Sequence, residues 1–195
     1  MTKPLITAAD IMPMAEYAKI RRDHRKALVQ VKKNRRLEVG PFATFHFENY
    51  DTMWAQIHEM LYIEKGGDEQ LQGELESYNP LIPKGRELVA TMLIEIEDEI
   101  KRARILATLG HIEDTISISF GAEKVMATPV DTAERTTPDG KTSAVHFLRF
   151  SMTDNQATQF KLPGTQVLLG IAHANYGHIA VMPESTRAEL TKDLA

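Results

Sequence analysis

The spacing of apolar residues changes about half-way along this chain of 195 residues, and that change limits the folds open to it. Within residues 14–33, apolar residues recur at the period of a helix, namely Ile20, Ala27, Leu28 and Val31. Within residues 142–152, side chains alternate between two faces, as in a strand. Helical patterns collect in the first half and strand patterns in the second. This order predicts an α+β fold, with a helical N-terminal half packed on a mostly antiparallel β-sheet, rather than a regular βαβ alternation.

Glycine, proline and capping residues divide the chain into expected elements. The expected helices span residues 13–35, 52–65, 68–77, 98–109 and 154–161. The expected strands span residues 37–47, 89–96, 115–120, 124–129, 142–152 and 166–173. Gly40-Pro41 interrupts the first of them and indicates an edge strand, a bulge or a break between two short strands. Residues 183–195 are expected to form a weak, exposed C-terminal helix or a tail. Since no repeat or low-complexity linker is present, we expect a single domain over residues 1–195.

The composition excludes several classes of functional site. The chain has no cysteine, which excludes disulfides, thiolate metal sites and thiol nucleophiles, so any metal would need His, Asp or Glu ligands. A cysteine-free chain fits the cytosol. The N-terminus has no signal-peptide pattern, and no apolar run approaches the roughly 20 residues of a membrane helix. We therefore expect a cytoplasmic protein without a membrane span.

Charge is distributed unevenly along the chain. Residues 19–36 hold nine basic residues and one acidic residue, a net charge of +8, so the remainder carries −12 of the total of −4. Residues 48–99 hold thirteen carboxylates against three basic residues. The basic helix could bind nucleic acid through residues 19–36, but it lacks interleaved aromatic residues and the whole chain is acidic. The pattern favours pairing with the acidic stretch, in the same chain or in a partner.

Two familiar catalytic motifs are incomplete. The run Gly140-Lys141-Thr142-Ser143 resembles the end of a phosphate-binding loop, but the first glycine of that motif is replaced by Arg135. The pair His58-Glu59 resembles the start of a zinc-protease helix, but the second histidine is replaced by Tyr62. Neither motif supports its usual chemistry here.

Several polar side chains occupy positions on otherwise apolar faces. Glu64 falls within the apolar arc of its helix, where it is either paired, metal-bound or a helix-end carboxylate that reaches water. Four polar residues lie on otherwise apolar strand faces, namely Glu95, His146, Arg149 and His173. A sheet could gather His46, Glu48, Glu95, His146 and His173 in one place. If the sheet brings three of them together, they could bind non-haem iron or another divalent metal, or haem. The alternative is structural pairing, for example between Glu95 and Arg149.

Four segments resemble a bacterial family known as domain of unknown function 3501. They are Phe47–Asn49, Gln56–Leu61, Glu74–Pro83 and Thr142–Phe150. Glu16-Tyr17 near the start, and His173 with Tyr176 near the end, are similar as well. The resemblance spans nearly the whole chain, and it nominates for mutation Glu48, Gln56, Glu59, Glu64, His146, Arg149 and His173.

The resemblance also implies a context. Genes of this family often lie near those of rubrerythrin-like di-iron proteins and heterodisulfide-reductase-like iron–sulfur proteins. The first hypothesis is therefore a non-catalytic accessory or partner protein of a cytoplasmic iron- or peroxide-linked redox system. The second is a metal- or haem-dependent oxidoreductase whose ligands include Glu48, Glu95, His146 and His173, and the third is nucleic-acid binding through the basic helix. The oligomeric state stays open, a homo-oligomer included.

Overall fold

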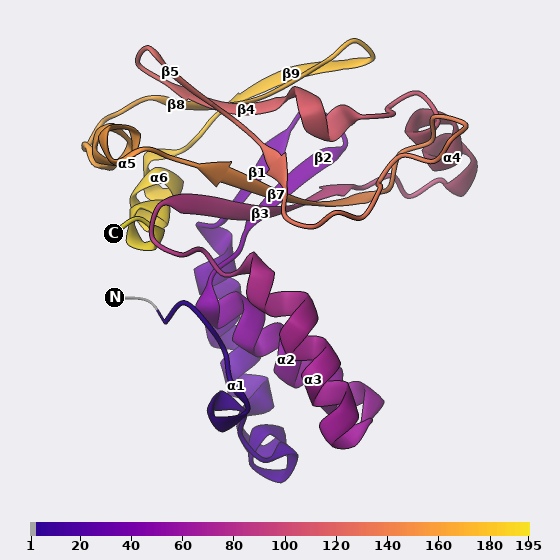
Figure 1. Ribbon diagram of the computed structural model, residues 1–195, viewed down its shortest axis with the longest axis vertical. Coiled ribbons are helices and arrows are strands. Elements are labelled where there is room, and N and C mark those ends of the chain that lie inside the picture. Colours follow the sequence, from indigo (N-terminus) through magenta and orange to yellow (C-terminus); the bar gives the residue numbers. More distant parts are fainter. Residues whose placement is uncertain (1–2) are drawn as a thin grey trace.

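Three helices form an arm that projects from a body of β-sheets (Figure 1). This computed structural model describes residues 3–195. The arm consists of α1 (Met14–Lys33), α2 (Tyr50–Glu64) and α3 (Gly67–Tyr78). Helix α2 packs against both α1 and α3. A short 3-10 turn at Ala8–Asp10 precedes the arm.

The ends of α2 follow from its sequence. Asn49 caps the helix, because its side chain accepts a hydrogen bond from the Thr52 backbone N–H at 2.9 Å while the Thr52 hydroxyl accepts one from the Asn49 N–H. At the other end Lys65 adopts a left-handed conformation with φ of 57°, and Gly66-Gly67 follow. This tight turn brings the start of α3 back beside the end of α2.

Within residues 3–195, nine strands form two antiparallel sheets. The first sheet has the order β1-β2-β3-β7-β6, with β1 (Arg36–Val39), β2 (Ala43–Phe47), β3 (Glu87–Ile94), β7 (Val145–Ser151) and β6 (Thr128–Pro129). The second has the order β5-β4-β8-β9, with β5 (Glu123–Met126), β4 (Ile116–Phe120), β8 (Val167–His173) and β9 (Tyr176–Val181). Strands β1 and β9 also contact each other, so the sheets meet along one side.

The first sheet is buried on both faces. Leu88, Ala90 and Met92 of β3 join the larger apolar core, which lies between the two sheets. Val89 points the other way, into a smaller core that it shares with Ile57 of α2 and the other apolar residues of the arm. Because one sheet contributes to both cores, the arm and the sheets form one α+β domain, as the sequence predicted.

Three shorter helices, α4 (Glu99–Leu106), α5 (Asp154–Lys161) and α6 (Glu184–Leu190), lie around the body. The C-terminal helix expected within residues 183–195 is present as α6, but the expectation that it is exposed was wrong. Leu190 is fully buried, the Arg187 guanidinium donates to the Phe160 carbonyl at 2.7 Å, and Asp193 forms a buried ion pair with Arg35. The long apolar stems and paired charges of this segment hold it against the body.

Two strand predictions need correction. Residues 124–129 do not form one strand, because Thr128–Pro129 leaves β4 and pairs instead with β7 of the other sheet. Strand β9 was not anticipated, since its edge position tolerates a mixture of small and polar residues. The break at Gly40-Pro41 is confirmed, as it separates β1 from β2. No helix within residues 3–195 combines the length and the hydrophobicity that a membrane span requires.

Candidate functional site

The predicted cluster of strand histidines and carboxylates does not form. His46, Glu48 and Glu95 lie on the face of the first sheet that looks toward the arm, whereas His146 of β7 pairs with Met92 and points between the sheets. His173 belongs to the second sheet. Within the described range 3–195, no three His, Asp or Glu side chains are grouped so as to hold a metal. The sheet itself separates the residues that the strand pattern suggested would meet.

Both oxygens of Glu48 are occupied by neighbouring hydroxyls. The Thr52 hydroxyl donates to one oxygen at 2.7 Å and the Thr91 hydroxyl to the other at 2.8 Å. His46 lies nearby in the same small pocket of about 200 Å³, and burial lowers the pKa of its imidazole. Glu48 therefore anchors the start of α2 to the sheet, which is a structural task.

His146 has an incomplete set of partners. Its Nε2 lies 2.9 Å from the Ser143 carbonyl oxygen, which can only accept, so this nitrogen carries a proton. Its Nδ1 lies 3.5 Å from Oε2 of Glu113, and both atoms are buried without a hydrogen-bond partner among the residues that the structure describes. Burial lowers the pKa of His146, opposed by the charge of Glu113.

The other strand candidates, His173, Glu95 and Arg149, each have separate local surroundings. His173 accepts from the Asn175 N–H through Nδ1 and donates through Nε2 to the Gly110 carbonyl, both at 3.2 Å. The suggested Glu95–Arg149 pair was wrong, because Arg149 lies 3.3 Å from Glu87, while Glu95 is half exposed and its nearest basic partner lies 3.9 Å away.

The helix candidates separate into exposed and packed residues. Glu64 is exposed and accepts a hydrogen bond from Gln70 at 3.0 Å, which confirms the interpretation as a helix-end carboxylate. The Gln56 amide donates to the Tyr78 hydroxyl at 3.3 Å, joining α2 to α3. Only Glu59 lies at the centre of a larger polar network.

Glu59 connects α2 to α1. The Tyr17 hydroxyl donates to one carboxylate oxygen at 2.6 Å, and Arg21 donates to both oxygens at 2.9 and 2.8 Å. The Arg21 guanidinium lowers the pKa of Glu59, and burial together with Glu59 raises the pKa of Tyr17. The phenol therefore stays protonated, and the network holds the first turns of α1 on α2.

The segment before α1 is fixed to α2 by two further hydrogen bonds. The buried His58 donates from Nδ1 to the Trp54 carbonyl at 2.7 Å, so its Nε2 accepts the Met12 backbone N–H at 3.1 Å. The Trp54 indole N–H donates to the Asp10 carbonyl at 2.8 Å. The rings of His58 and Trp54 stack with centroids 3.7 Å apart. These contacts hold the 8–13 segment in place as one wall of a cleft.

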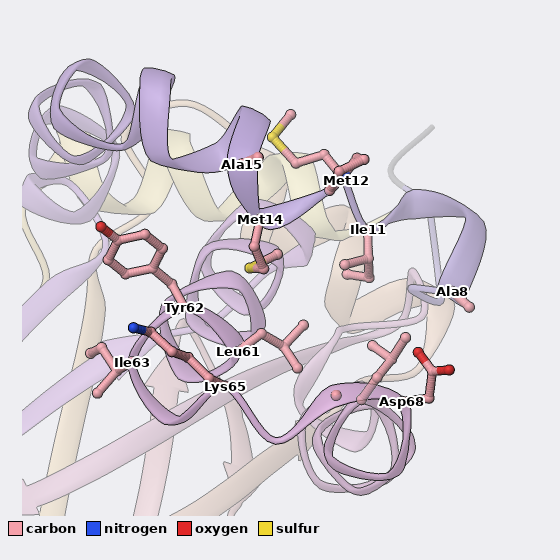
Figure 2. Close-up of a pocket in the computed structure, with 13 residues that line it drawn as sticks. Ala8, Ile11, Met12, Met14, Ala15, Leu61, Tyr62, Ile63, Lys65 and Asp68 are labelled. Atoms are coloured by element: carbon pink, nitrogen blue, oxygen red, sulfur yellow. The ribbon is translucent and has the colours of Figure 1, made fainter.

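The arm cleft, as we call it, opens at the tip of the arm (Figure 2). It has a volume of about 880 Å³ and lies between the 8–15 segment, the end of α2 and the start of α3. Ile11 and Met14 point toward Leu61 across it in Figure 2. The apolar residues that line it include Ile11, Met12, Met14, Leu61, Ile63 and Leu71.

The lining of the arm cleft contains few charged side chains. Its charged lining residues, among those the structure describes, are Lys65 and Asp68. Ile63 keeps 63% of its surface exposed, although it is a large apolar residue. Tyr62 forms part of the wall, and the Arg21 guanidinium covers its ring at 4.7 Å. A concave, mostly apolar space of this volume suits apolar side chains or an apolar ligand.

Comparisons with known proteins agree with this architecture. The family model described as "Protein of unknown function (DUF3501)" matches residues 5–194. The chain belongs to the DUF3501 family. A crystal structure of a novel protein of unknown function from Burkholderia pseudomallei K96243 matches with a TM-score of 0.90 and 37% identity, over 97% of this chain and 99% of that one. No curated protein matches the chain.

The arm cleft of this DUF3501 chain was not anticipated from the sequence. Two signals could have indicated it. The apolar run Ile11-Met12-Pro13-Met14 leads into the first residue of α1, and Leu61-Tyr62-Ile63 is a mostly apolar run near the end of α2. Apolar residues at the ends of two elements, outside the main periodic face, leave an uncovered apolar surface where those ends meet. Glu113, the partner of His146, was also missed, because it lies in a short 3-10 turn.

Proposed function

We propose that this chain is a non-catalytic accessory protein that binds a partner protein through the arm cleft. The observation that carries this proposal is the cleft itself, which is open, mostly apolar and about 880 Å³ in volume. Exposed apolar surface of this kind is unfavourable in water, and its usual explanation in a folded protein is recognition of another molecule. Two methionines, Met12 and Met14, add side chains that adapt to different apolar partners.

The polar groups beside the cleft support binding rather than catalysis. Tyr17, Arg21 and Glu59 are engaged with one another, and both ring nitrogens of His58 are bonded to the backbone. Groups engaged with one another in this way hold the walls in place and are not free to act as a base or nucleophile toward a bound molecule. The cleft is thus a rigid docking site whose contacts are mainly apolar.

The class of partner comes from the family resemblance. It points to a rubrerythrin-like di-iron protein or an iron–sulfur protein of a cytoplasmic redox system linked to iron or peroxide. In this proposal the chain carries no redox centre of its own. It holds, positions or protects a protein that does.

The test compares two exposed isoleucines. Ile63→Glu places a charge in the cleft, and Ile179→Glu places one on β9, where the side chain is 71% exposed. Binding to a purified rubrerythrin-like protein and to an iron–sulfur protein is measured by biolayer interferometry. We expect Ile63→Glu to weaken binding at least about tenfold and Ile179→Glu to leave it unchanged. Equal effects of the two substitutions would contradict the docking site, and no binding to either protein would remove this partner class.

A further inference from the structure

One face of α1 carries a line of exposed basic side chains that begins at the arm cleft. These side chains, which we call the basic stripe, belong to Lys19, Arg22, Arg25, Lys26 and Lys33. Ala15 lines the cleft, and Arg22, Lys26 and Lys33 follow it by 7, 11 and 18 positions. At 3.6 residues per turn these intervals are close to whole turns, so the four residues lie on one line along the helix. The line spans about 27 Å at 1.5 Å per residue.

The basic stripe is not neutralised by direct ion pairs within the described chain, although Glu16 and Asp23 lie beside it on α1. None of its five residues forms an ion pair in the described residues 3–195. The link between α1 and the acidic stretch 48–99 is made by Arg21, which is outside the stripe and bonds to Glu59. Helix α3, which carries exposed carboxylates, contacts α2 on its own side of the arm. The internal pairing that the sequence suggested for the basic helix therefore does not neutralise this face.

We propose that the partner presents an acidic segment with an apolar anchor, so that the anchor fills the arm cleft and carboxylates lie along the basic stripe. This inference rests on the proposed function, because it names the chemistry of the partner that the same site binds. The cleft and the stripe form one continuous surface, because Ala15, which lines the cleft, lies on the same line along α1 as Arg22, Lys26 and Lys33. An occupant of the whole surface needs apolar side chains at one end and negative charge over the next five helical turns.

The features of the stripe favour a protein segment over a nucleic acid. Glu16 and Asp23 border the stripe on α1 and would repel a continuous phosphate backbone. Val29 lies within the stripe with 63% of its surface exposed, and it offers a contact to an apolar side chain. A nucleic-acid backbone also has no apolar group to fill the cleft. A peptide can alternate carboxylates and apolar side chains to match both.

The cleft and the basic stripe contribute to partner binding in different ways. The cleft removes apolar surface from water and so contributes most of the affinity. The stripe attracts the acidic segment over a distance and sets its direction along α1, and both effects weaken as salt screens the charges. Loss of the stripe should therefore reduce the rate of association and the salt dependence more than it changes the dissociation rate.

The experiment selects binders from a displayed library of random 16-residue peptides, with the wild-type chain as bait. The selected peptides are then measured against three variants by fluorescence anisotropy, at low and at high salt. The variants are Ile63→Glu in the cleft, the double variant Arg22→Glu/Lys26→Glu in the stripe, and the control Lys124→Glu/Lys141→Glu on the β-body. All of these positions are exposed, and melting curves check that each variant folds.

We expect peptides with an apolar cluster beside several Asp or Glu residues. Their affinity should fall at least about tenfold in Arg22→Glu/Lys26→Glu, fall with added salt, and stay unchanged in the control. Cleft-dependent peptides with no acidic bias would overturn the inference and leave the proposed function standing. Peptides unaffected by Ile63→Glu would overturn both. Binding of duplex oligonucleotides or of anionic vesicles that is lost in the stripe variant would assign the stripe to those occupants and overturn the inference.

Discussion

Nδ1 of His146 faces Oε2 of Glu113 at 3.5 Å in the buried region between the two sheets. The Ser143 carbonyl fixes the proton of the neutral imidazole on Nε2, so Nδ1 is left as an acceptor. The imidazole nitrogen and the carboxylate oxygen thus present two acceptors to each other, which explains why neither atom is hydrogen-bonded. Protonation of His146 supplies the missing donor, but burial opposes it.

This contact predicts a pH dependence of stability. Burial lowers the pKa of folded His146 below the ordinary value of 6.5, which the unfolded chain retains. The unfolded state therefore binds more protons, and the free energy of unfolding falls as the pH drops below about 6.5 and through the folded pKa. His146→Gln removes this contribution. Urea denaturation from about pH 7 to about pH 5 should show a shallower decline in the variant than in the wild type.

Replacing Glu113 tests the same contact between His146 and Glu113. Glu113→Gln removes the negative charge that favours the imidazolium, so the pKa of His146 should fall further, as followed by NMR titration of its ring. A raised or unchanged pKa would contradict the role given to Glu113. Burial also raises the pKa of Asp193 to about 6, so this carboxyl adds stability as the pH falls and opposes the effect of His146. The contribution of His146 to the pH dependence of stability therefore comes from comparing the wild type with the His146→Gln variant.

The ion pair between Arg35 and Asp193 should be essential for stability. Arg35 is 1% exposed and Asp193 is 2% exposed, and without the carboxylate the nearest remaining charge to the guanidinium is Glu189 at 3.5 Å. Asp193→Ala leaves a buried guanidinium without its main partner and should cost about 3–5 kcal/mol in urea denaturation. The control Glu38→Ala breaks the exposed pair with Arg36 and should cost less than about 1 kcal/mol. Similar losses in the two variants would refute this ranking.

The network around Glu59 predicts a structural rather than a chemical phenotype. Glu59→Gln weakens the bonds from Tyr17 and Arg21 and should lower the free energy of unfolding by about 1–3 kcal/mol. Glu64→Gln changes an exposed carboxylate of the same helix and should stay within about 0.5 kcal/mol. Thermal and urea unfolding of both variants provide the comparison. Partner binding lost in a Glu59→Gln protein of unchanged stability would instead assign Glu59 to the interface.

Local patterns predicted the elements well, because caps, periods and breakers act over a few residues. The helix 154–161 was predicted at both ends, and the alternation in β7 correctly placed His146 and Arg149 on opposite faces. Local patterns do not determine which distant strands pair or in what register. The alternation along β7 was correct, yet the register through β3 places His46 and His146 on opposite sides of the sheet.

The candidate site depends even more on distant contacts. The arm cleft forms because Met12 bonds to His58, and Asp10 bonds to Trp54, across more than forty residues of sequence. No spacing rule connects those positions. The basic stripe, in contrast, was visible in the sequence as a charged helix, since it needs only the geometry of one element. Whether its charges are neutralised depends on which helices flank α1, and that is a property of the packed arm.

The turn at Gly40 gives a prediction about how the two sheets are joined. Tyr176 of β9 donates its hydroxyl proton to the Val39 carbonyl at 2.8 Å and accepts the N–H groups of Phe42 and Ala43, so it closes the turn between β1 and β2. Gly40 has a φ of 70°, and an added Cβ would lie 2.5 Å from the His178 ring and 2.8 Å from the Tyr176 hydroxyl. Gly40→Ala must therefore distort both the backbone and the contact between the sheets.

Gly164 provides the matched control, because its φ is 78° but an added Cβ meets nothing within 4 Å. Gly164→Ala should cost about 1 kcal/mol from backbone strain alone. Gly40→Ala should cost about 3 kcal/mol, since overpacking adds to the same strain. Urea denaturation measures both losses, and near-ultraviolet circular dichroism reports whether the Tyr176 environment changes only in Gly40→Ala. Equal losses without a change at Tyr176 would mean that the sheets adjust freely at this junction, and that the hydroxyl of Tyr176 does not hold them together.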